Sequence, residues 1–318
     1  MDGIQGVPRR LGALPGSLSL PSTGNAGTPE LLSRPDRVEL SAEARAQRSG
    51  APVDVTDEAT LALLRTGGSE DRALAREAEQ ARSSYRSLLE SGARVLVGRS
   101  AGNGGAPFVA VVPQTLVARP EQPFEAVVHY GGMYGTAARP DPGGGLPARI
   151  KARAEGPPPA VLVLCEARNH EGMPGGHGGY SPDWSSASDP GLVAQDALDG
   201  LGLTGDRRLV VSAHSAGGRA IAALVAKGRL ACDRLELQDC LYGNGRGLSS
   251  GRAVLAWAGT PEGRACREII YMHAARGQNG EQHLLPDGIR LAGGQVVRRI
   301  EMTRHYDAAF HVEARASR

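Results

Sequence analysis

Residues 208–221 read Arg208-Leu209-Val210-Val211-Ser212-Ala213-His214-Ser215-Ala216-Gly217-Gly218-Arg219-Ala220-Ile221, and this stretch decides the fold. Residues 209–211 form a short apolar run, which is typical of a buried parallel strand. From Ala220 onward apolar residues recur at helical spacing, until Gly228 indicates the end of a helix. The stretch therefore predicts a strand that turns sharply into a helix at Ser215.

Ser215 occupies the position of a nucleophile in such a turn. A serine there adopts unusual backbone angles that lift its hydroxyl clear of the sheet, and the turn needs small residues two positions before and after it. Ala213 and Gly217 fill these places. The free N–H groups at the start of the helix favour developing negative charge. We interpret Ser215 as a nucleophile, the alternative being an inert serine in the turn of an ordinary doubly wound fold.

A second serine motif lacks this context. Residues 247–251 read Gly-Leu-Ser-Ser-Gly, but they follow the loop-like residues 242–246 instead of an apolar strand. Without a strand, no turn holds the serine above a sheet. We therefore interpret Ser249 or Ser250 as the N-cap of a helix that begins near Gly251.

The composition excludes several classes of protein. A net charge of +2 argues against a nucleic-acid-binding protein, because such binding requires a concentrated basic face. No run approaches the roughly 20 apolar residues of a membrane span, and the first residues lack a secretory apolar core. We expect a cytoplasmic protein, with export by a non-classical route left open. The cysteines lack metal-type spacing and are interpreted as structural thiols: Cys165, Cys232, Cys240 and Cys266.

The patterning divides the chain into three parts. Residues 1–55 are a low-complexity arm rich in Pro, Gly, Ser and Arg, which does not offset its own ordering entropy and is free for a protein partner. Residues 56–93 show an amphipathic helical pattern that breaks at Gly67-Gly68, with Leu61, Leu63 and Leu64 on the apolar side. Residues 94–318 form the main domain.

Strands and helices alternate through residues 94–318, which predicts an α/β fold. Residues 94–98 and 108–112 are expected to pair antiparallel across the glycine-rich turn at 102–105. Helices are expected at residues 192–203 and 252–257, and a surface loop at 135–159. Further strands begin at residues 124, 160, 209, 234, 267 and 296.

The strand that begins at residue 124 runs into the turn His129-Tyr130-Gly131-Gly132-Met133. Glycines at a strand end let backbone N–H groups approach a substrate oxygen. Gly131, Gly132 or Met133 is thus a candidate for one oxyanion-hole donor, with the N–H of Ala216 as the other. The alternative is a tight turn that merely requires glycine.

A long polar loop follows the strand that ends at Cys165. It leaves the carboxyl end of a strand, where open α/β sheets bind ligands, so we expect it to contact the substrate. Its His170, Glu171, His177 and Asp183 match no defined ligand spacing, so no metal is expected. The expected substrate-binding residues are Tyr130, His214, Asn169 and His170.

Two polar residues at later strand ends complete a catalytic set. Asp239 ends the strand after the serine turn and is suited to orient an imidazole; Glu281, in a later loop, is the rival acid. His305 lies just past the last strand and is the expected base. It is preferred on position to His273, His283 and His311.

The order Ser215, Asp239, His305, together with the His-x-Gly-Gly turn, resembles the α/β-hydrolase superfamily over residues 94–318. The resemblance implies a mostly parallel sheet flanked by helices, with Ser215 as nucleophile, His305 as general base and Asp239 holding the imidazole. The chain departs from the usual pattern at Ala213, where Gly is commonest, and at Asp239, which follows an earlier strand than usual.

The resemblance implies a serine hydrolase without a cofactor that acts on a small-molecule or peptide-like acyl substrate. Carboxylic esters are the first expectation, because the His-x-Gly-Gly turn is similar to that of lipases and carboxylesterases. An amidase or peptidase, acting for example on a cell-wall peptide, is the alternative within the same triad chemistry. A non-catalytic binding protein on a hydrolase scaffold is the alternative from another class.

Overall fold

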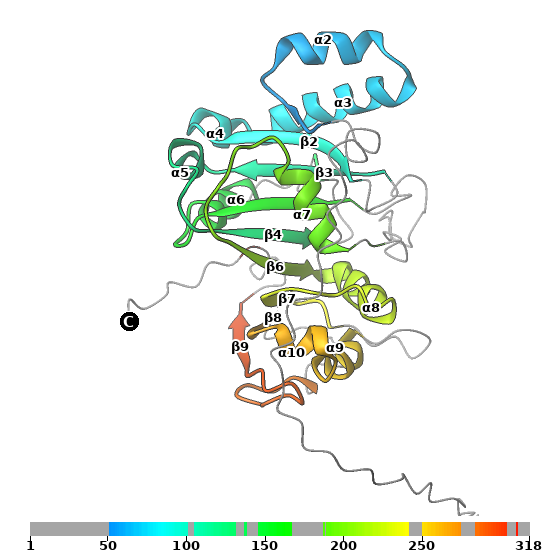
Figure 1. The fold of residues 1–318 in the computed structure, drawn as a ribbon, viewed down its shortest axis with the longest axis vertical. Helices are drawn as coiled ribbons and strands as arrows, with labels where there is room; N and C mark the ends of the chain where they lie inside the picture. Colours follow the sequence, from blue (N-terminus) through cyan, green and yellow to red (C-terminus); the bar gives the residue numbers. More distant parts are fainter. Residues whose placement is uncertain are drawn as a thin grey trace, which may run out of the picture. The chain divides into compact units, whose positions relative to one another are not determined.

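A computed structural model describes residues 51–100, 105–131, 137–138, 146–166, 187, 189–241, 250–274, 284–303 and 310. Within these ranges nine strands form a single sheet in the order β1-β2-β3-β5-β4-β6-β7-β8-β9 (Figure 1). The strands are β1 Val53–Asp54, β2 Arg94–Ser100, β3 Ala106–Val112, β4 Phe124–Tyr130, β5 Ala160–Cys165, β6 Arg207–His214, β7 Arg234–Gln238, β8 Glu268–Ala274 and β9 Val297–Met302.

The sheet is antiparallel at one edge and parallel elsewhere. β1 pairs antiparallel with β2, β2 with β3, and β3 with β5. All pairs from β5 to β9 are parallel. The mostly parallel sheet and the antiparallel pairing of residues 94–98 with 108–112 are thus confirmed, while residues 101–104 of the expected turn lie outside the described ranges. β5 lies between β3 and β4, and β6 lies on the other side of β4. A crossover connection joins each of these parallel strands to the next.

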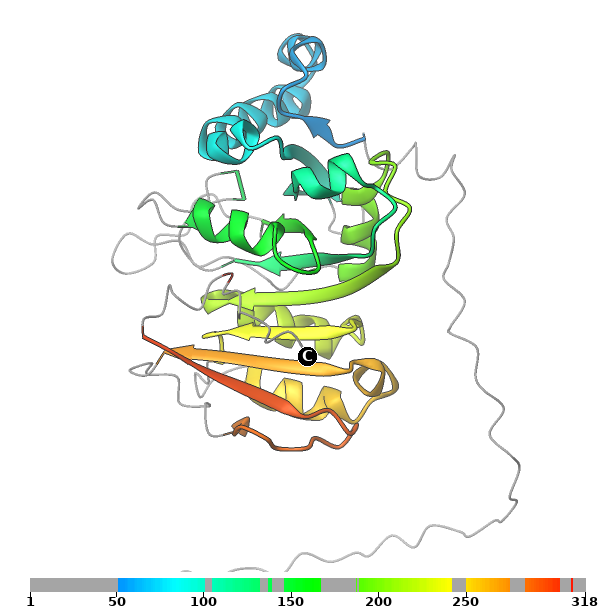
Figure 2. The same cartoon turned by 90° about the vertical axis from the view of Figure 1, so that its left-hand side faces the viewer.

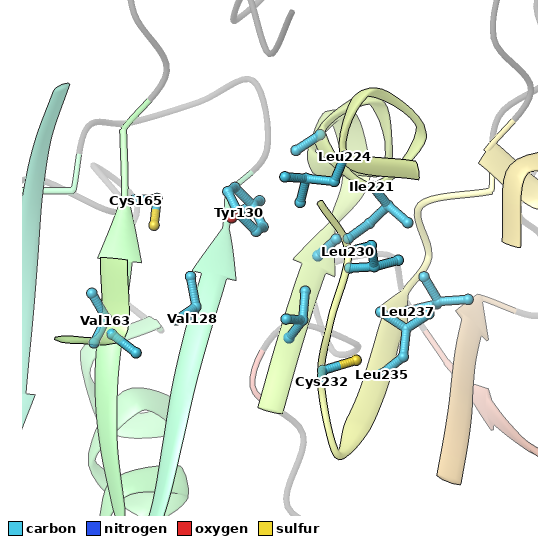
Figure 3. Close-up of a cluster of buried hydrophobic side chains, with 14 of the residues drawn as sticks. Val128, Tyr130, Val163, Cys165, Ile221, Leu224, Leu230, Cys232, Leu235 and Leu237 are labelled. Carbon is cyan, nitrogen blue, oxygen red and sulfur yellow. The ribbon is translucent and has the colours of Figure 1, made fainter. Parts of the chain in front are cut away.

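Helices cover both faces of the sheet (Figures 1 and 2). Helices α7, α8 and α9 pack against one face through residues such as Val193, Ile221 and Val254. Figure 3 shows part of this cluster, including Ile221 and Leu224. The other face carries α3, α4 and α6 through Ala78, Leu88 and Ile150. The described helices are α2 Glu58–Thr66, α3 Ser69–Ser84, α4 Arg86–Glu90, α5 Gln114–Ala118, α6 Leu146–Ala154, α7 Pro190–Leu198, α8 Gly218–Ala226, α9 Ser250–Ala258 and α10 Pro261–Ala265.

The predicted amphipathic segment forms α2, α3 and α4, with the break at Gly67-Gly68 between the first two. Leu61 is fully buried, but Leu63 is 73% exposed, so its assignment to the apolar side was wrong. Residues two positions apart in a helix lie about 200° apart around its axis, so Leu63 lies on the side opposite Leu61. Val53–Asp54, counted in the arm from the sequence, pair with β2, while residues 1–50 lie outside the described ranges.

Two expected boundaries differ from the structure. Residues 146–154, expected within a loop, form α6, because Ile150 and Ala154 lie one turn apart and both are fully buried against the sheet. The helix expected at 192–203 is α7, which begins earlier because Asp189 caps it by accepting from the N–H of Gly191. It ends at Leu198, before Gly200 takes a φ of 75°.

None of the helices within the described ranges is both long and apolar enough to cross a bilayer.

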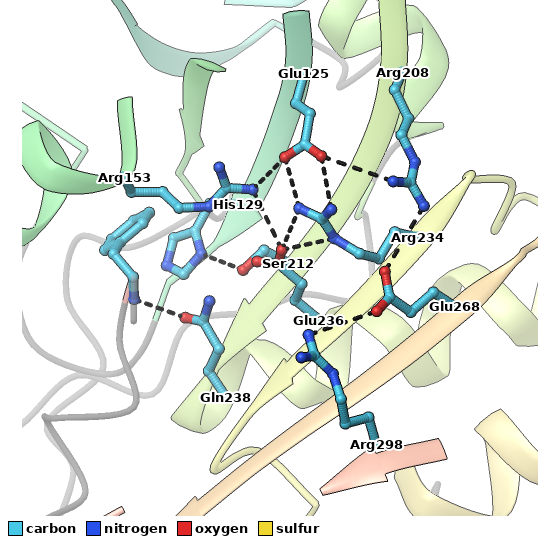
Figure 4. Close-up of polar contacts among 11 residues, drawn as sticks. Glu125, His129, Arg153, Arg208, Ser212, Arg234, Glu236, Gln238, Glu268 and Arg298 are labelled. Carbon is cyan, nitrogen blue, oxygen red and sulfur yellow. Dashed lines mark hydrogen bonds and ion pairs between the residues drawn. The ribbon is translucent and has the colours of Figure 1, made fainter. Parts of the chain in front are cut away.

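A charged network lies on one face of the sheet near the start of β4 and β7 (Figure 4). Both guanidinium N–H groups of Arg234 donate to the carboxylate of Glu125 at 2.6 Å, and Arg153 of α6 donates to the same carboxylate at 2.7 Å. Arg234 also donates to Glu236 at 2.9 Å. Glu125 is only 1% exposed, so its charge depends on these partners. Toward β9 the network continues through Arg208, Glu268 and Arg298.

We predict that Glu125→Gln lowers the free energy of unfolding by about 3–5 kcal/mol, because it leaves the buried guanidinium groups of Arg234 and Arg153 with Glu236 as their one remaining carboxylate among the described contacts. Urea denaturation at neutral pH measures this. The matched control is Glu79→Gln, which removes the ion pair between Glu79 and Arg65. This pair lies at the surface, because the Glu79 side chain is 51% exposed. The control is expected to cost less than about 1 kcal/mol, and equal losses in the two variants would contradict the assignment.

Acid should weaken the fold through the same carboxylate. Burial alone raises the pKa of Glu125, but its hydrogen bonds and charge contacts with Arg234 and Arg153 outweigh burial and hold the pKa below the ordinary 4.5. Such a group stabilises the fold above its unfolded pKa and loses that contribution as pH falls through the folded value. The free energy of unfolding should therefore decline below pH 4.5, and less steeply in Glu125→Gln.

Candidate active site

The strained turn expected at Ser215 is present. Ser215 follows β6 directly and has a φ of 52°, in the left-handed region that L side chains rarely adopt. The short helix Ser215–Gly217 then leads into α8, which ends before Gly228 at a φ of 62°. The strand, the turn and the helix stop are thus where the sequence places them.

Two glycines after Ser215 allow the turn to approach neighbouring main chain. A Cβ at Gly217 would lie 2.0 Å from the carbonyl oxygen of Tyr130, and one at Gly218 would lie 2.0 Å from that of Cys240. No side chain fits at either distance, and backbone atoms have little room to yield. The start of α8 therefore sits directly against the chain that leaves β4 and the chain that leaves β7.

Asp239 is the first residue after β7 and has a φ of 45°. It is 1% exposed, and its backbone N–H donates to the carbonyl oxygen of Met272 on β8 at 2.6 Å. Because β6 and β7 are parallel neighbours, with His214 opposite Gln238, Ser215 and Asp239 follow paired positions at the same edge of the sheet. The structure thus brings these two predicted residues to adjacent strand ends.

Gly131 lies on the β4 side of the Ser215 turn, and Ala216 follows Ser215 within the turn. β4 pairs with β6 so that Tyr130 is opposite Ala213, which places Gly131 beside the residues that lead into Ser215. A Cβ at Gly131 would meet no atom of the described residues within 4 Å. Ala216, in contrast, is 6% exposed. The two predicted oxyanion donors therefore belong to neighbouring segments.

The residues expected to touch the substrate differ in their surroundings. The Tyr130 side chain is fully buried in the core with Val128 and Ile221 (Figure 3), so only its backbone borders the turn. His214 is 7% exposed. Other predicted site residues lie outside the described residues: Gly132, Met133, Asn169, His170, Glu171, His177, Asp183, Glu281, His283, His305 and His311. His273, a rejected base, lies on β8 and is 5% exposed.

Within the described ranges no three His, Cys, Asp or Glu side chains are grouped closely enough to hold a metal ion. All four cysteines are buried. Burial raises the pKa of the Cys165 thiol, which keeps it protonated and unreactive.

The topology decides the fold family. Apart from the short edge strand β1, the strands lie in the order β2-β3-β5-β4-β6-β7-β8-β9, with β3 antiparallel to both neighbours. A strained serine turn follows the central strand β6. The fold is that of an α/β-hydrolase.

Solved structures with this fold are similar to the chain at low identity. An α/β serine hydrolase without a lid from Xanthomonas campestris is 15% identical over 67% of this chain and 86% of its own, with a TM-score of 0.39. An S-formylglutathione hydrolase from Agrobacterium tumefaciens is 12% identical over 68% and 90%, with a TM-score of 0.40. A siderophore hydrolase from Aspergillus nidulans is 10% identical over 70% and 92%, with a TM-score of 0.42.

No protein-family model matches the sequence, and no curated protein matches it.

We predict that Gly217→Ala destabilises the α/β-hydrolase fold by about 1–3 kcal/mol, because the added methyl group overlaps the Tyr130 carbonyl oxygen. Chemical denaturation measures the change. Gly259→Ala is the matched control, since its Cβ would lie 3.6 Å from its nearest neighbours, an ordinary contact. If Gly217→Ala were as stable as the control, the close approach of α8 to β4 would be wrong.

Proposed function

We propose that this protein is a serine hydrolase that cleaves carboxylic esters through an acyl-enzyme. The proposal rests on the strained turn at Ser215, which lies between the Gly131 end of β4 and Asp239 at the end of β7. A positive φ at a non-glycine residue costs on the order of 1–3 kcal/mol, and such strain clusters at functional sites. The strain at Ser215 therefore supports a functional role for this residue.

The chemistry follows from the roles assigned to the residues. The Ser215 hydroxyl oxygen attacks the ester carbonyl carbon while His305 accepts its proton. The N–H of Ala216 and that of Gly131 or Gly132 hold the oxyanion. Collapse of the intermediate expels the alcohol, which takes the proton from His305 and leaves an acyl group on Ser215. Water, activated by the same histidine, then releases the acid.

Asp239 is proposed to orient His305 and to stabilise its positive charge during the reaction. Support comes from its burial and from its position one strand beyond the serine turn. The small acyl substrate and the absence of a cofactor requirement belong to the same proposal, because the triad and backbone donors supply every proton and charge contact that ester cleavage needs.

Fluorophosphonate labelling tests the nucleophile. The wild-type protein should be labelled covalently, Ser215→Ala should lose labelling, and Ser249→Ala should retain it. Gel fluorescence of folded protein, checked by circular dichroism, is the measurement. No labelling of the folded wild type, or labelling that survives in Ser215→Ala, would overturn the proposal.

Hydrolysis of a p-nitrophenyl ester tests the acid. Asp239→Asn should lower kcat by on the order of 10⁴, because the amide stabilises the wrong imidazole tautomer. Glu281→Gln should retain most of the activity. If only Glu281→Gln were inactive, Glu281 would be the acid and the role of Asp239 would be wrong.

A further inference from the structure

Phe310 follows the end of β9 by eight residues, and it is buried in the core with Val127 of β4. Its ring stacks on that of His129 with centroids 4.2 Å apart and an angle of 41° between the planes. Its backbone N–H donates to the side-chain oxygen of Gln238 on β7 at 3.2 Å. Phe310 is 2% exposed, so both contacts are shielded from water. It therefore binds two strands through two different kinds of interaction.

These contacts link the strands that carry the candidate site. His129 is also hydrogen-bonded to the Ser212 hydroxyl, with Nδ1 and Oγ 3.1 Å apart, so the cluster ties in β6 as well (Figure 4). His129 precedes Tyr130-Gly131, Ser212 lies three residues before Ser215, and Gln238 immediately precedes Asp239. One buried cluster thus links the three strands that carry the proposed oxyanion donor, nucleophile and acid.

The cluster is held at a cost in backbone strain. Phe310 has a φ of 52°, and a bulky residue in this region is a genuine outlier. Strain of this kind persists only where surrounding contacts over-determine it. Burial and the nearby charge of His214 lower the pKa of His129 to about 3, so its ring stays neutral and stacks as an aromatic surface at ordinary pH.

We propose that Phe310 is a positioning residue, whose stacking on His129 and bond to Gln238 hold the ends of β4 and β7, and with them Gly131 and Asp239, in place beside Ser215. The inference rests on the proposed hydrolase function. Loss of this contact should shift Gly131 and Asp239 relative to Ser215. A misplacement of about 1 Å can cost on the order of 100-fold in rate, so the effect should fall on kcat and not on KM.

The experiment uses the full chain with Phe310→Leu, Phe310→Gly and Phe310→Tyr, assayed on a p-nitrophenyl ester. We expect Phe310→Leu to lower kcat by about tenfold or more with KM nearly unchanged. Phe310→Gly should show the same loss although glycine tolerates the positive φ, which assigns the effect to the ring. Phe310→Tyr should restore most of the activity.

Phe108→Leu is the matched control, because Phe108 is an equally buried aromatic residue on β3, at the antiparallel edge of the sheet. It should lower the melting temperature but retain kcat per folded molecule. Gln238→Leu provides a second route if the Phe310 variants fold poorly, and it should also lower kcat.

Unchanged kcat in the Phe310 and Gln238 variants, an equal loss in Phe108→Leu, or an effect on KM alone would overturn the inference while wild-type labelling at Ser215 still supports the hydrolase. Absent labelling of the wild type would overturn both proposals.

Discussion

The site depends on a main-chain contact between the start of α8 and the ends of β4 and β7. At Gly217 and Gly218 the backbone lies where a Cβ would overlap a carbonyl oxygen of the neighbouring segment. The turn that carries Ser215 is therefore located by main-chain packing. Gly131 and Asp239 become its neighbours through strand pairing, which fixes them more firmly than mobile side chains would. Donors held in this way need little rearrangement when charge develops on a substrate oxygen.

Buried contacts offset the backbone strain of the residues at the proposed site. The non-glycine residues with positive φ in the described part of the chain are Ser215, Asp239 and Phe310, and all three belong to the proposed site or its support. Each such conformation costs on the order of 1–3 kcal/mol. The apolar clusters on both faces of the sheet and the paired charges around Glu125 offset that cost. The network lies toward the starts of β4 and β7, so both ends of these strands are held.

Local patterns in the sequence were sufficient for the sheet and the turn. Ala213 and Gly217 around Ser215 predict the strained turn, because that conformation tolerates only small neighbours. Long-range contacts were not predictable in the same way. The Pro/Gly/Arg composition of residues 135–159 does not indicate α6, whose Arg153 is buried against the carboxylates of Glu125 and Glu236. His129 and Gln238 were given no role, since nothing local indicates that Phe310 packs against both. The roles of Asp239 and His305 stay predictions.

Trapping the covalent intermediate tests whether Ser215 is the nucleophile. The protein is quenched in acid during turnover of p-nitrophenyl acetate, and its peptides are mapped by mass spectrometry. We expect a single acetyl group on the Ser215 hydroxyl, which builds up during turnover and is absent when the ester is omitted. Ester hydrolysis with no acyl group on Ser215, or with the acyl group on another residue such as Ser249, would contradict it.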